Sequence, residues 1–238
     1  MTLNVEFEFG PEEAPKRMVI YADGDIDFPD DDLTFDLAAQ EFGYPETEVI
    51  KLYNKWKKDP IKVIYEDIGV WPVIKVWLMI ESAEQVLQIL ENDFSKEEIQ
   101  PLQQCLNQAR VAALDAETFD VQTKKSKKLK KLMTLRKQVD LFLSEKVVAP
   151  ANLKKKPMSL AHMHAVTATW SVAAFLTSGV VLIGESRIAA AYNASNRQGS
   201  SEWKAARHEQ ELWEINRFVE LTHSITSRVM QGPADPEK

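Results

Sequence analysis

The sequence predicts a mainly α protein, a bundle or hairpin of long helices with a small N-terminal α+β segment that includes a β-hairpin. Three observations lead to this fold class. Only eight glycines occur in 238 residues, whereas sheet-rich proteins need many glycines in their tight turns. Apolar residues recur at helical spacing through most of the chain, and they alternate with polar residues near the N-terminus. The hydrophobic share of 45% is enough for a substantial core.

Residues 1–70 form an acidic segment that mixes strand and helix patterns. In residues 3–9 apolar and polar side chains alternate with the period of two that is typical of a strand with one buried face. Residues 17–22 are rich in strand-forming side chains, and the sequence PEEAPK between the two stretches suits a turn, which predicts a β-hairpin. A run of aspartates then precedes apolar positions at helical spacing, so we expect a helix over residues 33–42. A second short helix should end before Pro60.

Residues 71–149 form a region with strong helical patterns. A densely apolar stretch begins at Trp71, and the sequence SKEEIQ matches a capping box in which Ser95 and Glu98 bond to each other's backbone amides. Further along, residues 120–147 predict a basic helix with an apolar seam at alternating spacings of three and four. The members of this seam are Leu132, Leu135, Val139 and Phe142.

The predicted basic helix carries a dense run of cationic side chains. The candidates for contact with an anion or a lipid are Lys124, Lys125, Lys127, Lys128, Lys130, Lys131 and Arg136. Near an anionic membrane each such charge contributes about 1 kcal/mol of attraction. The alternative is a solvated helix face that the acidic N-terminal segment balances. Nucleic acid is the less favoured partner, because no aromatic side chain is interleaved in the run to stack on bases.

A linker at residues 150–157 leads into an apolar stretch, for which we expect one long helix over residues 158–198. The stretch from residue 157 to residue 184 contains no lysine, arginine, aspartate or glutamate, which makes residues 160–184 a candidate membrane span. Three lysines stand directly before it, and the positive-inside rule then leaves the N-terminal region in the cytosol. The alternative is the buried core helix of a bundle, because the stretch holds hydroxyl side chains and places Trp170 well inside it.

Small side chains recur at every fourth position of this helix, so they lie along one face. They are Ala161, Ala165, Thr169, Ala173 and Thr177. Such a stripe lets a second helix approach closely, both between membrane helices and in soluble bundles. The stripe therefore predicts a partner helix and does not choose between the two environments.

A C-terminal amphipathic helix is expected over residues 200–231, with Ser200 and Ser201 as its capping residues. Its apolar stripe requires burial against another helix or another copy of the chain. The packing candidates in this helix are Leu212, Ile215, Val219 and Val229. The prolines and charges of residues 232–238 predict a disordered tail.

The sequence contains only part of a metal-binding motif. Asp23, Asp25 and Asp27 have the spacing of a calcium loop, but Phe28 stands where that loop needs glycine and Thr34 where it needs glutamate. We therefore expect an acidic turn, no metal and no cofactor.

The candidate catalytic residues likewise form only incomplete motifs. Glu220 and His223 share a helix face, but the second carboxylate–histidine motif of a di-metal bundle does not occur. His162 and His164 are two positions apart, so they point to different sides of a helix. Cys105 lies in a stretch that looks structural, and no phosphate-binding glycine loop or serine elbow occurs. We therefore expect no enzyme and no small-molecule substrate; an enzyme would need a site assembled from residues distant in the sequence.

These patterns together predict a non-enzymatic, membrane-associated helical interaction or assembly protein. The single cysteine and the lack of a secretory signal favour a cytoplasmic location, with the N-terminus in the cytosol if a membrane anchor is present. A protein partner or a homo-oligomer is expected. The alternative is a soluble helical-bundle structural or adaptor subunit of a larger particle, viral or multi-subunit, with the apolar helix buried in its core.

Overall fold

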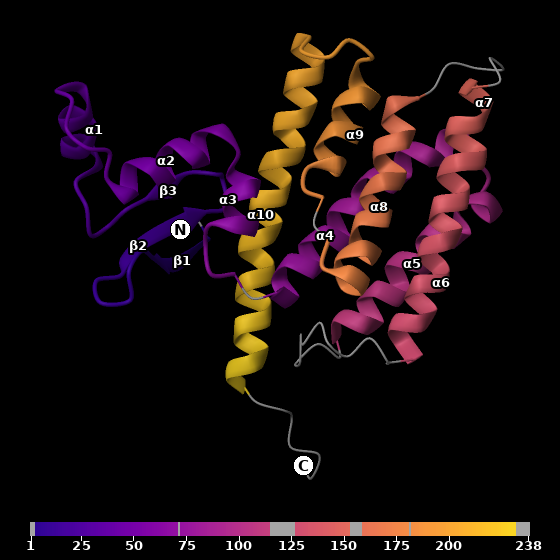
Figure 1. Ribbon diagram of the computed structural model, residues 1–238, viewed down its shortest axis with the longest axis horizontal. Helices are drawn as coiled ribbons and strands as arrows, with labels where there is room; N and C mark the ends of the chain where they lie inside the picture. Colours follow the sequence, from indigo (N-terminus) through magenta and orange to yellow (C-terminus); the bar gives the residue numbers. More distant parts are fainter. Residues whose placement is uncertain (1–2, 71, 115–126, 153–158, 181, 232–238) are drawn as a thin grey trace. The chain divides into compact units, whose positions relative to one another are not determined.

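The computed structural model describes residues 3–70, 72–114, 127–152, 159–180 and 182–231 (Figure 1). Within these ranges the predicted fold class is confirmed, because the protein is mainly helical with a small antiparallel sheet near the N-terminus. The chain forms two compact units. The first unit consists of Met1–Ile74 and Glu211–Lys238, and the second consists of Lys75–Gln210.

The sheet of the first unit contains β1 (Asn4–Phe9), β2 (Lys16–Tyr21) and β3 (Ile26–Asp27), each antiparallel to the next. β1 and β2 form the predicted hairpin, and their register pairs Val5 with Ile20. Both of these side chains are buried. The alternation of apolar and polar residues thus gives the hairpin one face for the core.

Three short helices follow the sheet: α1 (Leu33–Glu41), α2 (Glu48–Lys58) and α3 (Pro60–Glu66). Each helix begins after a residue whose side chain accepts a hydrogen bond from the first turn. These caps are Asp32, Thr47 and Asp59. α2 and α3 pack against each other and contribute buried apolar side chains to the core, whereas α1 buries none of its residues.

The long helix α10 (Ser201–Gln231) contributes its residues from Glu211 onward to the first unit. Ile215, Phe218 and Val219 are almost completely buried there. The ring of Phe218 stacks on Phe7 of β1 with a centroid distance of 5.6 Å. This part of α10 therefore supplies the core that the sheet requires.

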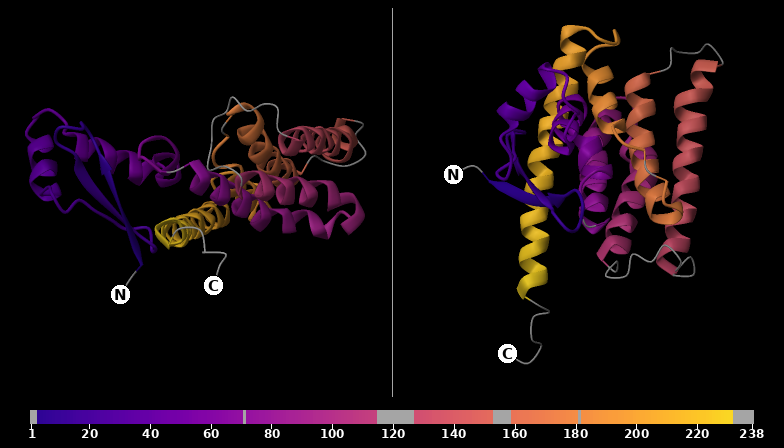
Figure 2. Two further views of the ribbon diagram at one scale, coloured as in Figure 1. Left: turned by 90° about the horizontal axis from the view of Figure 1, so that it is seen from below. Right: turned by 60° about the vertical axis from the view of Figure 1, so that its left-hand side comes forward.

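The second unit contains most of α4 and a series of helices that continue from it. They are α4 (Pro72–Leu87), η1 (Gln88–Asn92), α5 (Lys96–Leu114), α6 (Lys127–Phe142), η3 (Leu143–Val148), α7 (Ala149–Asn152), α8 (Leu160–Ser178) and α9 (Glu185–Ala194). α8 lies between α6 and α9 and also packs against α5 (Figures 1 and 2). The predicted capping box starts α5, since the N–H of Ser95 donates to Glu98 Oε2 at 3.0 Å and the N–H of Glu98 donates to Ser95 Oγ at 3.3 Å.

The single long helix expected over residues 158–198 is wrong, because two helices occupy this stretch. α8 ends at Ser178 and is capped by Gly179, which has the left-handed conformation with φ of 70°. α9 begins after Gly184, which has a φ of 93°. Glycine adopts such angles without steric cost, so the two glycines interrupt the apolar stretch. Within the described ranges, no helix has both the length and the hydropathy needed to cross a membrane.

Several hydroxyl side chains of the apolar helix α8 bond to its own backbone, whereas the buried Thr169 Oγ1 has no hydrogen-bond partner among the described residues. Ser171 and Thr177 each donate a hydrogen bond to the carbonyl four residues earlier, with oxygen–oxygen distances of 2.7 and 2.6 Å. The helix backbone thereby satisfies these hydroxyls, which removes the cost of burying them unpaired. The predicted basic helix also differs in extent, since α6 continues through a π turn at η3 into α7, beyond residue 147.

Candidate functional site

Among the described residues, the most exposed aromatic side chains lie on and just after α1. The exposed fractions are 71% for Phe35, 80% for Phe42 and 65% for Tyr44. Phe35 and Phe42 are seven positions apart and so lie on the same side of the helical turn. We call Phe35, Phe42 and Tyr44 the α1 surface. A helix that buries nothing of its own and exposes large rings is typical of a contact surface for another molecule.

The N-terminal segment that carries the α1 surface is acidic in sequence. The first 47 residues contain thirteen aspartates and glutamates and only two basic residues, Lys16 and Arg17. Lys16 pairs with Asp31 at 2.6 Å, and Arg17 pairs with Asp30 at 2.6 Å and with Glu6 at 3.2 Å. The hydrogen bonds to these carboxylates raise the pKa of Arg17, and the bond from Arg17 lowers the pKa of Asp30. Most of the acidic charge therefore has no basic side chain within residues 1–47 to balance it, although α2, which packs against α1, carries Lys51, Lys55, Lys57 and Lys58.

The candidate calcium ligands belong to the same acidic segment but serve the turn itself. Asp23 accepts a hydrogen bond from the backbone N–H of Asp25, and Asp27 accepts one from the N–H of Phe28 at 2.8 Å. In the described part of the chain, no three acidic, histidine or cysteine side chains are grouped so that they could hold a metal. These contacts fit the interpretation of an acidic turn.

The candidate cations of the basic helix fall into three groups. Lys124 and Lys125 lie outside the described residues, and Lys127 and Lys128 lie in α6 with side chains that are not described. Lys130, Lys131 and Lys137 are exposed, together with Met133 and Leu141, whose exposed fractions are 50% and 54%. We call these five residues the α6 face. Lys130, Met133, Lys137 and Leu141 lie on the side of the helix opposite its buried seam, and Lys131 lies nearer to the seam.

Arg136 is turned the other way and binds inside the second unit. Its guanidinium carbon lies 4.4 Å from the centre of the Trp170 ring, and its Nη1 donates to Thr177 at 3.2 Å and to Ser178 at 3.4 Å. A guanidinium above an indole ring is a favourable cation–π contact. The structure thus uses Arg136 to join α6 to α8, although the sequence made it a candidate for anion binding.

The two sets of packing candidates lie mostly in the two cores. Ala161, Ala165, Thr169 and Ala173 are buried in α8, and Thr177 accepts the hydrogen bond from Arg136. In α10, Ile215 and Val219 are buried and Leu212 is half-buried. The side chain of Val229 lies outside the described part of the structure.

The candidate histidines, Glu220 and Cys105 are each accounted for by contacts within the fold or by burial. His162 Nε2 lies 3.1 Å from Asp93 and His164 Nδ1 lies 2.7 Å from Glu185, so the two imidazoles do contact different elements. Farther along the chain, Glu220 accepts a hydrogen bond from Arg217, and His223 contacts the carbonyl oxygen of Asn4. Burial raises the pKa of Cys105 to about 12, which leaves the thiol protonated and unreactive at neutral pH.

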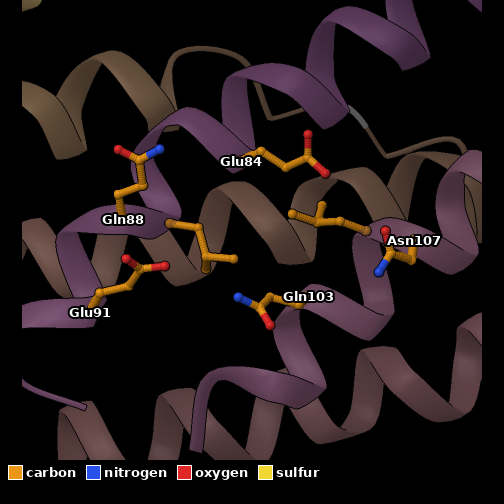
Figure 3. Close-up of a pocket in the computed structure, with 7 residues that line it drawn as sticks. Glu84, Gln88, Glu91, Gln103 and Asn107 are labelled. Carbon is orange, nitrogen blue, oxygen red and sulfur yellow. The ribbon is translucent and has the colours of Figure 1, made fainter. Parts of the chain in front are cut away.

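A groove of about 270 Å³ lies between α4 and η1 on one side and α5 on the other (Figure 3). Its apolar floor is formed by Leu87 and Leu106, and its polar walls consist of Glu84, Gln88, Glu91, Gln103 and Asn107. Glu84 pairs with Arg110, whose guanidinium lies 5.9 Å from the Trp77 ring. Burial nevertheless raises the pKa of Glu84, because desolvation outweighs the attraction of Arg110.

The groove can hydrogen-bond a polar group, and the residues that line it include no serine, cysteine, lysine or histidine. Its two carboxylates and three amides offer hydrogen-bond acceptors and donors to a bound polar group. Sequence reasoning missed both the groove and the α1 surface. The spacing of seven between Glu84 and Glu91, and between Phe35 and Phe42, was the one signal that placed each pair on one face.

Comparison with protein-family models gave no match, and neither the curated proteins nor the solved structures gave a significant match. The functional assignment therefore rests on the surfaces of the chain itself.

Proposed function

We propose that this chain is a non-enzymatic helical interaction protein that binds a protein partner through the α1 surface. The observation that carries this proposal is the exposure of Phe35, Phe42 and Tyr44 beside a helix that buries none of its residues. Aromatic side chains are enriched among the residues that dominate binding energy at protein interfaces. A partner that covers these rings removes a large apolar area from water.

The acidic surroundings of the α1 surface favour a basic partner. Carboxylates around an aromatic centre steer a positively charged surface to the site and repel acidic competitors. The two basic residues of this segment are already engaged with Glu6, Asp30 and Asp31. The proposed partner surface therefore combines basic side chains at its rim with an apolar centre.

A photocrosslinking experiment in cells tests this proposal. The photoreactive residue p-benzoylphenylalanine replaces Phe42 in the full chain, and a control chain carries it at Val111, an exposed apolar position on α5. We expect a discrete crosslinked protein adduct from position 42 and none from position 111. Adding Phe35→Ser should reduce the adduct at least about tenfold, because an aromatic anchor contributes about 2 kcal/mol or more.

Two outcomes would contradict the proposal. The first is the absence of a protein adduct from position 42, and the second is the same adducts in equal amounts from positions 42 and 111. Mass spectrometry of the adduct identifies the partner, which can be another protein or a second copy of this chain.

A further inference from the structure

We infer that the partner of the α1 surface is a second copy of this chain, which binds through its α6 face. This inference rests on the function proposed above and assigns the partner. The argument is complementarity in both charge and apolar character between two exposed surfaces of the same sequence.

The α6 face supplies the positive charge that the α1 surface requires. Residues 124–141 contain eight lysines and arginines and one acidic residue, Asp140, whereas residues 1–47 have thirteen acidic and two basic residues. Lys130, Lys131 and Lys137 are exposed on α6. Opposite charges of this density attract over roughly the Debye length of about 10 Å at 0.1 M salt.

The α6 face also supplies an apolar centre. Met133 and Leu141 are half exposed, and the spacing from Lys130 through Met133 and Lys137 to Leu141 places these four residues along one side of the helix. Methionine packs favourably against aromatic rings through its polarisable sulfur. The α6 face thus offers the rings of Phe35 and Phe42 an apolar strip with lysines beside it. This is the composition proposed above for the partner surface.

The contact between the two surfaces is heterologous, because a different patch of each copy takes part. Each molecule therefore keeps one free acidic surface and one free basic surface after a first contact forms. Such contacts generate closed rings or growing chains rather than a two-fold dimer. The size of the assembly should accordingly rise with protein concentration and fall with ionic strength.

The test measures the mass of the purified full chain by sedimentation velocity at about 1 to 100 µM protein, in about 50 mM and about 500 mM salt. The first variant, Phe35→Ser with Phe42→Ser, removes the aromatic centre. The second variant, Lys130→Glu with Lys131→Glu and Lys137→Glu, reverses the α6 face. Circular dichroism melting confirms that each variant is folded.

A matched control separates the α6 face from net charge alone. It makes the same three lysine-to-glutamate changes at Lys51, Lys96 and Lys204, which are exposed residues on α2, α5 and α10. We expect the wild type and this control to form assemblies, and each surface variant to be monomeric at concentrations about tenfold higher. The two surface variants mixed in equal amounts should form a dimer and nothing larger, because one intact contact remains between them.

Four outcomes would overturn the inference. The wild-type chain could be monomeric at every concentration. The control could lose assembly as fully as the α6 variant. The mixed variants could stay monomeric. Vesicles of phosphatidylserine and phosphatidylcholine could bind the wild type and lose binding to the α6 variant while self-association is unchanged, which would assign the face to a membrane surface.

The failure of this inference can be told from the failure of the proposed function. A monomeric chain whose position 42 crosslinks to a different protein removes the second copy as partner and leaves the proposed function intact. A monomeric chain without a specific adduct at position 42 removes both.

Discussion

Gly24 lies in the turn between β2 and β3, where its φ of +92° belongs to the left-handed region. A methyl group at this position would lie 2.9 Å from Leu212 Cδ2 and 3.6 Å from Ile215 Cδ1. We predict that Gly24→Ala lowers the free energy of unfolding by about 1–2 kcal/mol for the strained backbone. Displacing Leu212 should add up to about 1 kcal/mol. Urea denaturation measures the total.

Gly43 provides the matched control for this prediction. Its φ is +81°, but a methyl group there would have no neighbour within 4 Å. Gly43→Ala should therefore show the backbone cost alone. The double variant Gly24→Ala with Leu212→Ala should lose less stability than the sum of the losses of the two single variants. Equal losses for the two alanine variants, with additive effects of Leu212→Ala, would show that the close approach of Leu212 is energetically unimportant.

The sequence alone did not show which cations of the basic run are exposed and which contact other parts of the fold. Arg136 and Lys137 are adjacent and carry the same charge, yet the first contacts Trp170 and the second is exposed. Helical spacing places Arg136 next to the buried seam, but its partners Thr177 and Ser178 are about forty positions away in the sequence. Only the packing of α6 on α8 determines which of the two cations makes contacts with α8.

The elements themselves were predictable where a local pattern determines them. The hairpin followed from the alternation in residues 3–9, and the start of α5 followed from the reciprocal bonds of Ser95 and Glu98. The break between α8 and α9 was missed, although Gly179 and Gly184 are both present in the sequence. The apolar composition around them suggested a continuous helix, and a glycine breaks a helix only when tertiary packing favours the left-handed conformation.

The exposure of α1 was likewise not predictable from its pattern. Its apolar residues at helical spacing correctly indicated a helix, and such a stripe normally faces a core. No element in the described part of the chain covers Phe35 and Phe42, and the spacing of residues within one helix carries no information about that. The site therefore had to be found from the arrangement of the folded chain.

The contact between α6 and α8 gives a prediction at the scale of elements. Replacing Arg136 by lysine keeps the charge but removes the planar group that lies over Trp170 and reaches both Thr177 and Ser178. We expect Arg136→Lys to lower the free energy of unfolding by about 1–2 kcal/mol, because lysine cannot reproduce this geometry. Lys137→Ala, on the exposed side of the same turn, should change it by less than about 0.5 kcal/mol. Thermal and urea unfolding of both variants compare the two values, and equal small effects would mean that the contact is not stabilising.

At the scale of the whole molecule, each unit has its own core, and α10 belongs to both. Trp203 and Gln210 are buried in the part of α10 that belongs to the second unit, whereas Phe218 and Val219 are buried in the part that belongs to the first. A chain with two cores can lose one of them by local unfolding while the other remains protected from hydrogen exchange. This organisation was not visible in the sequence, because the first unit combines segments from the two ends of the chain.

Phe218 is the residue through which this organisation can be tested. It is completely buried and stacks on Phe7, so Phe218→Ala should cost the first unit about 3–5 kcal/mol. Hydrogen exchange measured segment by segment should then show faster exchange in β1, β2, α2 and α3, and nearly unchanged exchange in α5 and α8. Leu102→Ala, a buried position in α5, should give the reverse pattern. If either variant accelerates exchange equally in both units, the two cores unfold as one cooperative structure.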